Sequence, residues 1–275
     1  MQLIDTHTHF YDEAFDPDRN EVFNNAINSG VEAFVMPGIN LENIKPMLDV
    51  CGQYPGKCFP CIGLHPTEVK PDYKNILSIM EKIIGEHSFI AIGETGFDLY
   101  WDKTYAEEQK KALEIQIDWA LSTHLPLILH CRKAFDELYK ILKQHQNGNL
   151  TGVFHCFPGD EVQAKMVTDL GFMLGIGGVV TYKNSAMAKV ATSGPLEHIV
   201  LETDAPYLPP VPYRGQRNHS AYLIEIANKI ADLKEISPED IARVTTENAK
   251  RLFPLLTTPS VAGCTVYNYN SNLNY

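Results

Sequence analysis

The stretch F-I-A-I-G-E at residues 89–94 is an unbroken apolar run that ends on a carboxylate. A strand with one face in water alternates apolar and polar residues, whereas a strand covered on both faces is apolar throughout, as in parallel sheets. The run L-I-L-H at residues 127–130 has the same character and ends on an imidazole. Both runs predict buried parallel strands that carry a polar side chain at the carboxyl end.

Eight short runs of this kind, bounded by Gly, Pro and Asn, follow one another along the chain. Segments with helical spacing separate them, most clearly residues 104–124, where apolar residues recur near a 3.6-residue period. This alternation predicts an α/β fold, namely a single (β/α)8 TIM-type barrel. We expect its strands at residues 2–6, 32–36, 58–64, 88–93, 125–129, 150–154, 172–176 and 198–203.

An open doubly wound sheet is the alternative architecture. The dinucleotide fingerprint G-x-G-x-x-G is absent after the first predicted strand, and no phosphate-binding G-x-x-x-x-G-K-[ST] loop occurs. We therefore expect one barrel domain over residues 1–253. Residues 254–275 lose helical periodicity and are rich in Asn, Tyr, Ser and Thr, so we expect a peripheral C-terminal tail that is in part disordered.

The composition of the 275 residues is that of a soluble globular protein, with 44% hydrophobic and 21% charged residues. No long apolar run or secretion signal is present, so we expect a cytoplasmic protein without membrane contact. The formal charge of −11 argues against a broad basic surface that coats long nucleic acid. Nothing indicates an obligate protein partner. Six cysteines are too few for a disulfide scaffold, and we expect Cys58 and Cys61 to be core thiols on opposite faces of a strand.

The motif H-T-H at residues 7–9 follows the first predicted strand directly. Side chains two positions apart on a strand leave from the same face, so His7 and His9 can offer two imidazoles to one metal ion.

Four further histidines and acidic residues each end a predicted strand: Glu94, His130, His155 and Asp204. The carboxyl ends of barrel strands meet at one rim, so these residues are expected to converge with His7 and His9. Six donors exceed what one tetrahedral ion needs, which favours two divalent ions, Zn, Mn or Mg, sharing a carboxylate. Such a centre supports hydrolysis by a metal-activated water, and we expect Asp204 to accept the proton of that water.

The chain resembles the TatD family of metal-dependent hydrolases, within the amidohydrolase-like barrels, from His7 to about Phe253. The motifs that carry this resemblance are D-T-H-T-H at 5–9, G-L-H-P at 63–66, G-E-T-G-F-D at 93–98, H-C-R at 130–132, F-H-C-F-P-G at 154–159, L-E-T-D-A-P-Y-L-P-P-V-P-Y-R-G-Q-R-N at 201–218 and N-A-K-R-L-F at 248–253.

The resemblance implies a deoxyribonuclease that depends on divalent metal and is often exonucleolytic on single-stranded DNA. It implies that His7 and His9 hold one ion with Asp204, that Glu94 bridges, and that His130 and His155 hold the second ion. Glu94 stands where many relatives carry a carboxylated lysine, which suits oxygen-favouring ions. The residues H-S-A at 219–221 depart from the acidic residue and Pro expected there.

Four residues are candidates for substrate contact. Arg132 and Arg214 can pair with phosphate oxygens through the planar guanidinium fork. His65 is expected at the same rim, where it can contact a substrate phosphate or a metal-bound water. Tyr207 can stack on a base or pack its Pro-rich loop. Asp98 is expected to orient other site residues.

Two other functions stay open at this point. The same centre can hydrolyse an amide, lactone or ester, including an aminoacyl ester on transfer RNA. The second open function is that of a metal-stabilised binding or scaffold protein. Such a protein would require neither the full set of six donors nor a base, so the presence of both favours an enzyme.

Overall fold

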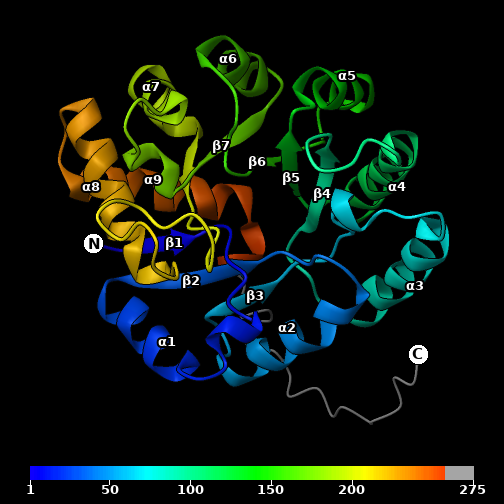
Figure 1. Ribbon diagram of the computed structural model, residues 1–275, viewed down its shortest axis with the longest axis horizontal. Coiled ribbons are helices and arrows are strands. Elements are labelled where there is room, and N and C mark those ends of the chain that lie inside the picture. The colour runs from blue at the N-terminus through cyan, green and yellow to red at the C-terminus, as the bar shows by residue number, and fades with distance from the viewer. Residues whose placement is uncertain (258–275) are drawn as a thin grey trace.

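The computed structural model describes residues 1–257 and contains eight parallel strands arranged as a TIM-type barrel (Figure 1). The strands form two sheets, of order β1-β2-β3 and β4-β5-β6-β7-β8. Their bounds are β1 Leu3–Asp5, β2 Val31–Met36, β3 Cys58–Pro60, β4 Ile92–Asp98, β5 Leu127–Arg132, β6 Gly152–Phe154, β7 Phe172–Ile176 and β8 Ile199–Leu201.

Backbone hydrogen bonds join the two sheets at both seams. Between β3 and β4, Ile62 N donates to Ala91 O over 3.2 Å and Gly93 N donates to Ile62 O over 2.8 Å. Between β8 and β1, Thr6 N donates to Leu201 O over 3.0 Å. These bonds close the ring of strands, as the sequence predicts.

A buried carboxylate strengthens the seam between β8 and β1. Asp5 accepts hydrogen bonds from Thr203 N over 2.9 Å and from Thr203 Oγ1 over 2.6 Å. Burial raises the pKa of Asp5 to about 7. The first and last strands are thereby fixed to each other directly below the segments that carry His7 and Asp204.

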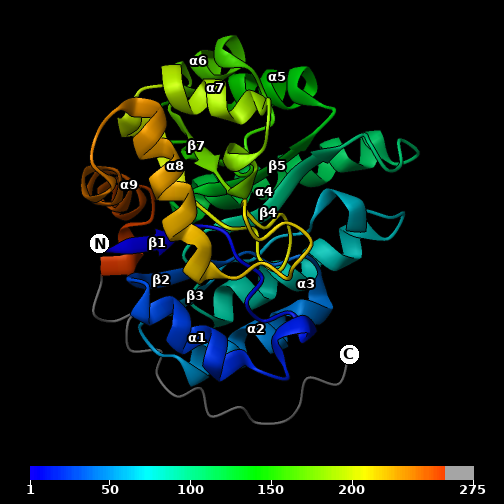
Figure 2. The ribbon, with the colours of Figure 1, turned by 60° about the vertical axis from the view of Figure 1, so that its left-hand side comes forward.

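Helices cover the outside of the barrel, one after most strands (Figures 1 and 2). Local signals mark several helix starts: Asn40 caps α2, Asp160 and Gln163 form a capping box on α6, and Ser237 caps α9 ahead of Pro238. The α-helices are α1 Arg19–Asn28, α2 Leu41–Gln53, α3 Tyr73–Glu86, α4 Ala106–Thr123, α5 Phe135–His145, α6 Glu161–Asp169, α7 Ala186–Ser193, α8 Leu223–Lys234 and α9 Pro238–Leu252.

Two apolar clusters make up the core. The larger one lies between the strands and the surrounding helices. The smaller one takes residues from every strand or its immediate flank, including Ile4, Ile128 and Val200, and therefore fills the barrel interior. Cys58 belongs to the outer cluster and Cys61 to the inner one, which confirms that the two thiols lie on opposite faces.

Helix α9 closes one end of the barrel. Leu252 and Phe253 pack into the inner cluster. Thr246 Oγ1 donates to Gln2 O and Asn248 Nδ2 donates to Ile199 O, both at strand starts. The amino end of the barrel is thus plugged, which leaves the carboxyl end for a site. None of the helices within residues 1–257 is long and apolar enough to cross a membrane.

The observed strands differ from the predicted ones mainly at their carboxyl ends. The fourth strand was expected to stop at residue 93, but β4 continues to Asp98 because it pairs with β5 as far as Asp98 opposite Arg132. Of the expected tail, Pro254–Thr257 forms a short 3₁₀ helix, and Leu255 and Leu256 pack against the inner cluster. The remaining part of the predicted tail, residues 258–275, lies outside the described residues.

Candidate metal centre

The predicted donors come together at the carboxyl end of the barrel. Some of them, however, lie at other positions relative to their strands than expected. His7 and His9 follow β1 instead of lying on it, and Thr8 between them bridges to Ala205. Glu94 and His130 lie inside β4 and β5, not beyond their ends. His155 and Asp204 follow β6 and β8, as predicted.

Close backbone approach lets β4 and β5 present Glu94 and His130 side by side. Gly96 has φ of +139°, and a Cβ at this position would lie 2.1 Å from His130 O. Only glycine fits both the dihedral and the space, so this residue of the G-E-T-G-F-D motif serves the packing of the two strands.

Glu94 is the central carboxylate of the site. Its Oε2 lies 3.2 Å from His7 Nε2 and 3.9 Å from His9 Nε2. Its Oε1 lies 2.8 Å from His130 Nδ1, 3.1 Å from His155 Nε2 and 3.3 Å from His65 Nε2. The two oxygens thus face two different sets of imidazoles, which is the arrangement that a bridging carboxylate requires.

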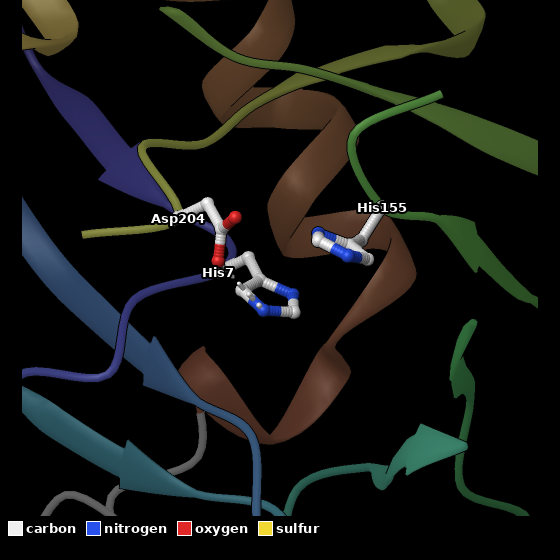
Figure 3. A group of neighbouring side chains, drawn as sticks. All are labelled: His7, His155 and Asp204. Atoms are coloured by element: carbon white, nitrogen blue, oxygen red, sulfur yellow. Dashed lines mark ion pairs between the residues drawn. The ribbon is translucent and has the colours of Figure 1, made fainter. Parts of the chain in front are cut away.

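Asp204 and His155 lie on either side of His7 (Figure 3). The His7 and His155 rings stack with centroids 3.9 Å apart, and His7 Nε2 is 3.6 Å from Asp204 Oδ1. Asp204 has φ of +57°, and its N donates to His7 O over 2.9 Å, so the left-handed turn places its carboxylate over the β8–β1 seam.

Donor atoms gather within 4.8 Å of one another in three groups, in which Glu94 and His7 each occur twice. The groups are His7, His155 and Asp204; His7, His9 and Glu94; and His65, Glu94 and His130. The third group includes His65, which was expected to contact a substrate phosphate or a metal-bound water. Its ring centroid lies 4.4 Å from that of His130, so His65 stands among the donors themselves.

The charges of the site fit divalent cations. Glu94 and Glu202 are 2% and 0% exposed. Every ion-pair partner that the structure describes for them is a histidine, without Lys or Arg. Buried carboxylates need a compensating charge, and imidazole nitrogens with carboxylate oxygens are ligands of Zn and Mn. The residues present therefore fit metal ions.

The pKa directions follow from burial and from mutual attraction. Burial opposes ionisation of Glu94, but the charges of His155, His65 and His7 outweigh it and hold the pKa of Glu94 well below its usual value. Burial also opposes protonation of His155, yet Glu94 and Glu202 raise its pKa well above the usual value. For Asp204, burial opposes ionisation, but the attraction of His9, His155 and His7 outweighs it, so the pKa of Asp204 is lowered. Asp204 is ready to act as an ionised carboxylate.

Tyr11 determines which nitrogen of His9 carries the proton. Its hydroxyl donates to Pro37 O over 2.7 Å and lies 3.1 Å from His9 Nδ1. A hydroxyl has one proton, so Tyr11 must accept a hydrogen bond from Nδ1–H of His9. This leaves the lone pair of His9 Nε2 free on the side of His7 and Asp204, as a metal ligand requires.

Two more carboxylates orient imidazoles. Asp98 Oδ2 lies 3.0 Å from His130 Nε2, which agrees with the orienting role expected for Asp98. Glu202 Oε1 lies 3.5 Å from His155 Nδ1, and no role was predicted for Glu202 although it stands within the motif at 201–218. The sequence feature that could have indicated a role for Glu202 is its position two residues before Asp204, at the end of the same predicted strand.

Two buried glutamines of α4 hold the segments that carry the donors. Gln116 Oε1 accepts from Leu64 N over 2.8 Å, next to His65, and its Nε2 donates to Thr95 Oγ1 over 2.7 Å, next to Glu94. Gln109 Oε1 accepts from Asp98 N over 3.1 Å. Neither glutamine was predicted from the sequence. Their spacing of seven residues places both on the apolar face of α4, where a polar side chain needs a buried hydrogen-bond partner.

A cavity of about 570 Å³ opens over the donors, and its lining includes Arg132, Tyr207 and Asp204. A second cavity of about 510 Å³ shares His130, Arg132, His155, Asp204 and Leu208 with the first and extends past Tyr182 and Lys183. Arg214 lines neither cavity. Its guanidinium lies 3.9 Å from the ring centroid of Tyr182, which lines the second cavity, so the phosphate contact of Arg214 stays a prediction.

Comparison with known proteins agrees with this geometry. The family model described as TatD related DNase matches residues 4–254. The uncharacterized metal-dependent hydrolase YabD of Bacillus subtilis is 36% identical over 252 residues, covering 91% of this chain and 98% of that protein. The uncharacterized metal-dependent hydrolase YcfH of Escherichia coli is 32% identical and covers 92% of this chain and 96% of its own.

Solved structures show the same relationship. The TatD homolog YjjV of Escherichia coli superposes with a TM-score of 0.86 at 30% identity, covering 92% of this chain and 98% of its own. A hydrolase TatD family protein of Entamoeba histolytica shares the fold with a TM-score of 0.79 at 22% identity. On the strength of the family match and the full-length relatives, the chain belongs to the TatD family of metal-dependent hydrolases.

Proposed function

We propose that the protein is a metal-dependent phosphodiesterase that cleaves DNA, acting from the end of a single strand. The observation that carries the proposal is the position of Arg132. This cation lines both cavities together with His155 and Asp204. A guanidinium beside a buried carboxylate and imidazole centre is suited to a phosphodiester, because it can hold a non-bridging oxygen while the phosphorus lies over the donors.

The two cavities give a chain-like substrate a path through the site. They meet at His155 and Asp204, so a strand can extend on both sides of its reacting phosphate. Lys183 adds a second cation to one cavity, and Tyr207 offers an exposed ring at the other. The whole chain carries a formal net charge of −11, which favours short contact with a few nucleotides over long contact.

In the proposed reaction, a water attacks phosphorus, the P–O ester bond breaks, and the leaving oxygen takes a proton from solvent. Asp204, with its lowered pKa, accepts the proton of the attacking water. Arg132 holds the phosphate, and Glu202, Asp98 and Tyr11 keep the imidazoles oriented. His7, His9 and Asp204 would hold one divalent ion, His130 and His155 a second, with Glu94 between them and His65 beside the second. The ions would supply Lewis-acid activation of water and phosphate.

A paired assay tests the proposal. Protein purified without chelator is analysed for its metals and incubated with single-stranded DNA, with duplex DNA and with a panel of esters, lactones and amides, including aminoacyl-tRNA. We expect release of nucleotides from single-stranded DNA with a shallow salt dependence, lost in the Asp204→Ala variant. Turnover of a carbon ester or amide without turnover of DNA would overturn the proposal in favour of the other hydrolase chemistry, and DNA cleavage that survives Asp204→Ala would indicate a contaminating nuclease.

A further inference from the structure

Three large aromatic side chains border the candidate metal centre in an exposed state. Among the described residues, Trp101 is 69% exposed, Tyr207 54% and Tyr100 52%. Trp101 and Tyr207 line the larger cavity. An indole left mostly in water contributes little to the barrel core, so its position at this mouth is better explained by a ligand.

The segment that carries Trp101 is fixed to the metal centre by one carboxylate. Asp98 Oδ1 accepts hydrogen bonds from Tyr100 N over 2.9 Å and from Trp101 N over 3.2 Å. Asp98 Oδ2 lies 3.0 Å from His130 Nε2. The same side chain therefore contacts an imidazole in the centre and fixes the backbone from which the indole at the mouth extends.

Arg132 packs against both rings. Its guanidinium carbon lies 4.0 Å from the ring centroid of Tyr100 and 5.0 Å from that of Trp101. The two rings meet edge to face, with centroids 4.9 Å apart. The ion pairs that the structure describes include none for Arg132, so its charge stays available to a ligand that enters the cavity.

We propose that Trp101, held beside Arg132, forms a stacking platform for the nucleobase next to the reacting phosphate of a single strand, while Arg132 holds that phosphate. This inference rests on the proposed function and adds the means of substrate positioning. A nucleobase is a flat aromatic group attached to a phosphate chain, and it matches an exposed indole beside a guanidinium that faces the catalytic cavity. Base stacking of this kind tolerates every sequence, whereas bases in a duplex keep their faces covered.

Intrinsic fluorescence provides a direct test, because the chain has two tryptophans and Trp119 is only 6% exposed. Short oligodeoxynucleotides are titrated into the protein in excess chelator, where no hydrolysis occurs. An abasic deoxyribose-phosphate oligomer of equal length serves as the probe without bases. We expect the base-bearing strand to quench Trp101 emission and the abasic oligomer to leave it unchanged. If both oligomers quench the emission equally, or if neither oligomer quenches it, the proposed platform is wrong.

Steady-state kinetics provide the second test, with the metal restored. We expect wild-type protein to prefer the base-bearing strand over the abasic oligomer by about ten-fold in kcat/KM, with the difference in KM. Trp101→Ala should remove this preference and Trp101→Phe should restore part of it. The matched control is Val162→Ala, which alters another exposed side chain, 70% exposed on α6, and should keep the preference.

The two proposals fail in different ways. If Trp101→Ala lowers the turnover of both oligomers equally, the residue has only a structural role and the platform is wrong, while the phosphodiesterase stands. If wild-type protein hydrolyses neither oligomer although the strand quenches Trp101, the platform stands and the proposed reaction is wrong.

Discussion

Gly175 lies directly against the side chain of Glu202. A Cβ built on Gly175 would stand 2.3 Å from Glu202 Oε2 and 3.1 Å from the Cα of His155. The absent side chain thus makes room for the carboxylate that orients His155. A small residue on β7, which contributes no donor itself, controls the geometry of the centre.

Gly175→Ala should therefore impair the centre without removing any polar group. We expect the new methyl group to displace Glu202, and hydrolytic activity to fall by about 10- to 100-fold, as it does when groups that orient metal ligands are lost. Glu202→Gln should give a loss of similar size. Gly52→Ala, where a Cβ meets nothing within 4 Å, is the control for a glycine substitution. Full activity in Gly175→Ala would contradict the positioning role of Glu202.

Tyr11→Phe removes only the hydroxyl that accepts the proton of His9 Nδ1. His9 then loses the partner that fixes its tautomer, so we expect metal affinity to fall by about 10- to 100-fold, measured as activity against the concentration of free Mn²⁺. Tyr54→Phe deletes a hydroxyl that contacts Asn20 away from the centre and should leave metal affinity unchanged. An unaltered metal titration in Tyr11→Phe would show that His9 keeps its orientation by other means.

Glu94→Gln should impair both metal binding and stability. The amide keeps the volume but loses the charge that faces five imidazoles, so we expect metal content and hydrolysis to be abolished. In chelator, removal of this buried partner should lower the free energy of unfolding by about 3 kcal/mol in urea titrations. The exposed Glu107 provides the control Glu107→Gln. Retention of two bound ions in Glu94→Gln would rule out a bridging role.

Metal binding should also be visible as added stability. An ion that binds only the folded chain stabilises it by about 2.7 kcal/mol at a hundred times its dissociation constant. We expect Mn²⁺ to raise the urea midpoint of the chelator-treated protein, and Asp204→Ala, which lacks one donor, to show a smaller rise. If Mn²⁺ leaves the midpoint of wild-type protein where it was, the donors do not form a metal site.

His219 should make stability depend on pH. Burial lowers its pKa below the usual 6.5, and the neighbouring Arg217 acts in the same direction while Asp18 opposes it. The unfolded chain then binds the proton first, so stability is lost as the pH falls below about 6.5. The difference in unfolding free energy between wild type and His219→Gln should shift in favour of the variant between neutral pH and pH values near 5. A difference independent of pH would show that His219 titrates alike in both states.

The sequence was sufficient for the barrel and for the convergence of the donors. Apolar runs covered on both faces report burial directly, which is why β7 was predicted with its observed bounds, Phe172–Ile176, and β6 with its observed carboxyl end. The prediction missed the continuation of β4 through T-G-F-D because Thr95, Gly96 and Asp98 are residue types that are common in exposed loops. In the folded chain these residues are buried, since Gln109 and Gln116 of α4 satisfy their polar groups.

The finer geometry of the site depends on contacts that have no local signal. The tautomer of His9 follows from Pro37, which lies 26 positions beyond Tyr11. Arg214 looked equivalent to Arg132 in the sequence, yet Arg132 lines both cavities, whereas Arg214 lies against Tyr182 at the wall of one of them. Such differences arise from how loops pack on one another, and residue type alone does not encode them.

The hydrogen bond from Asp204 N to His7 O has a consequence for biosynthesis. The two ends of the centre are separated by nearly the whole barrel, and a ribosome releases them far apart in time. A nascent chain that has emerged only as far as β7 holds the first donors but has neither Asp204 nor the strand that seals the ring. The full donor set therefore cannot assemble before β8 and Asp204 have left the ribosome, although His7, His9, Glu94, His130 and His155 precede them in the chain.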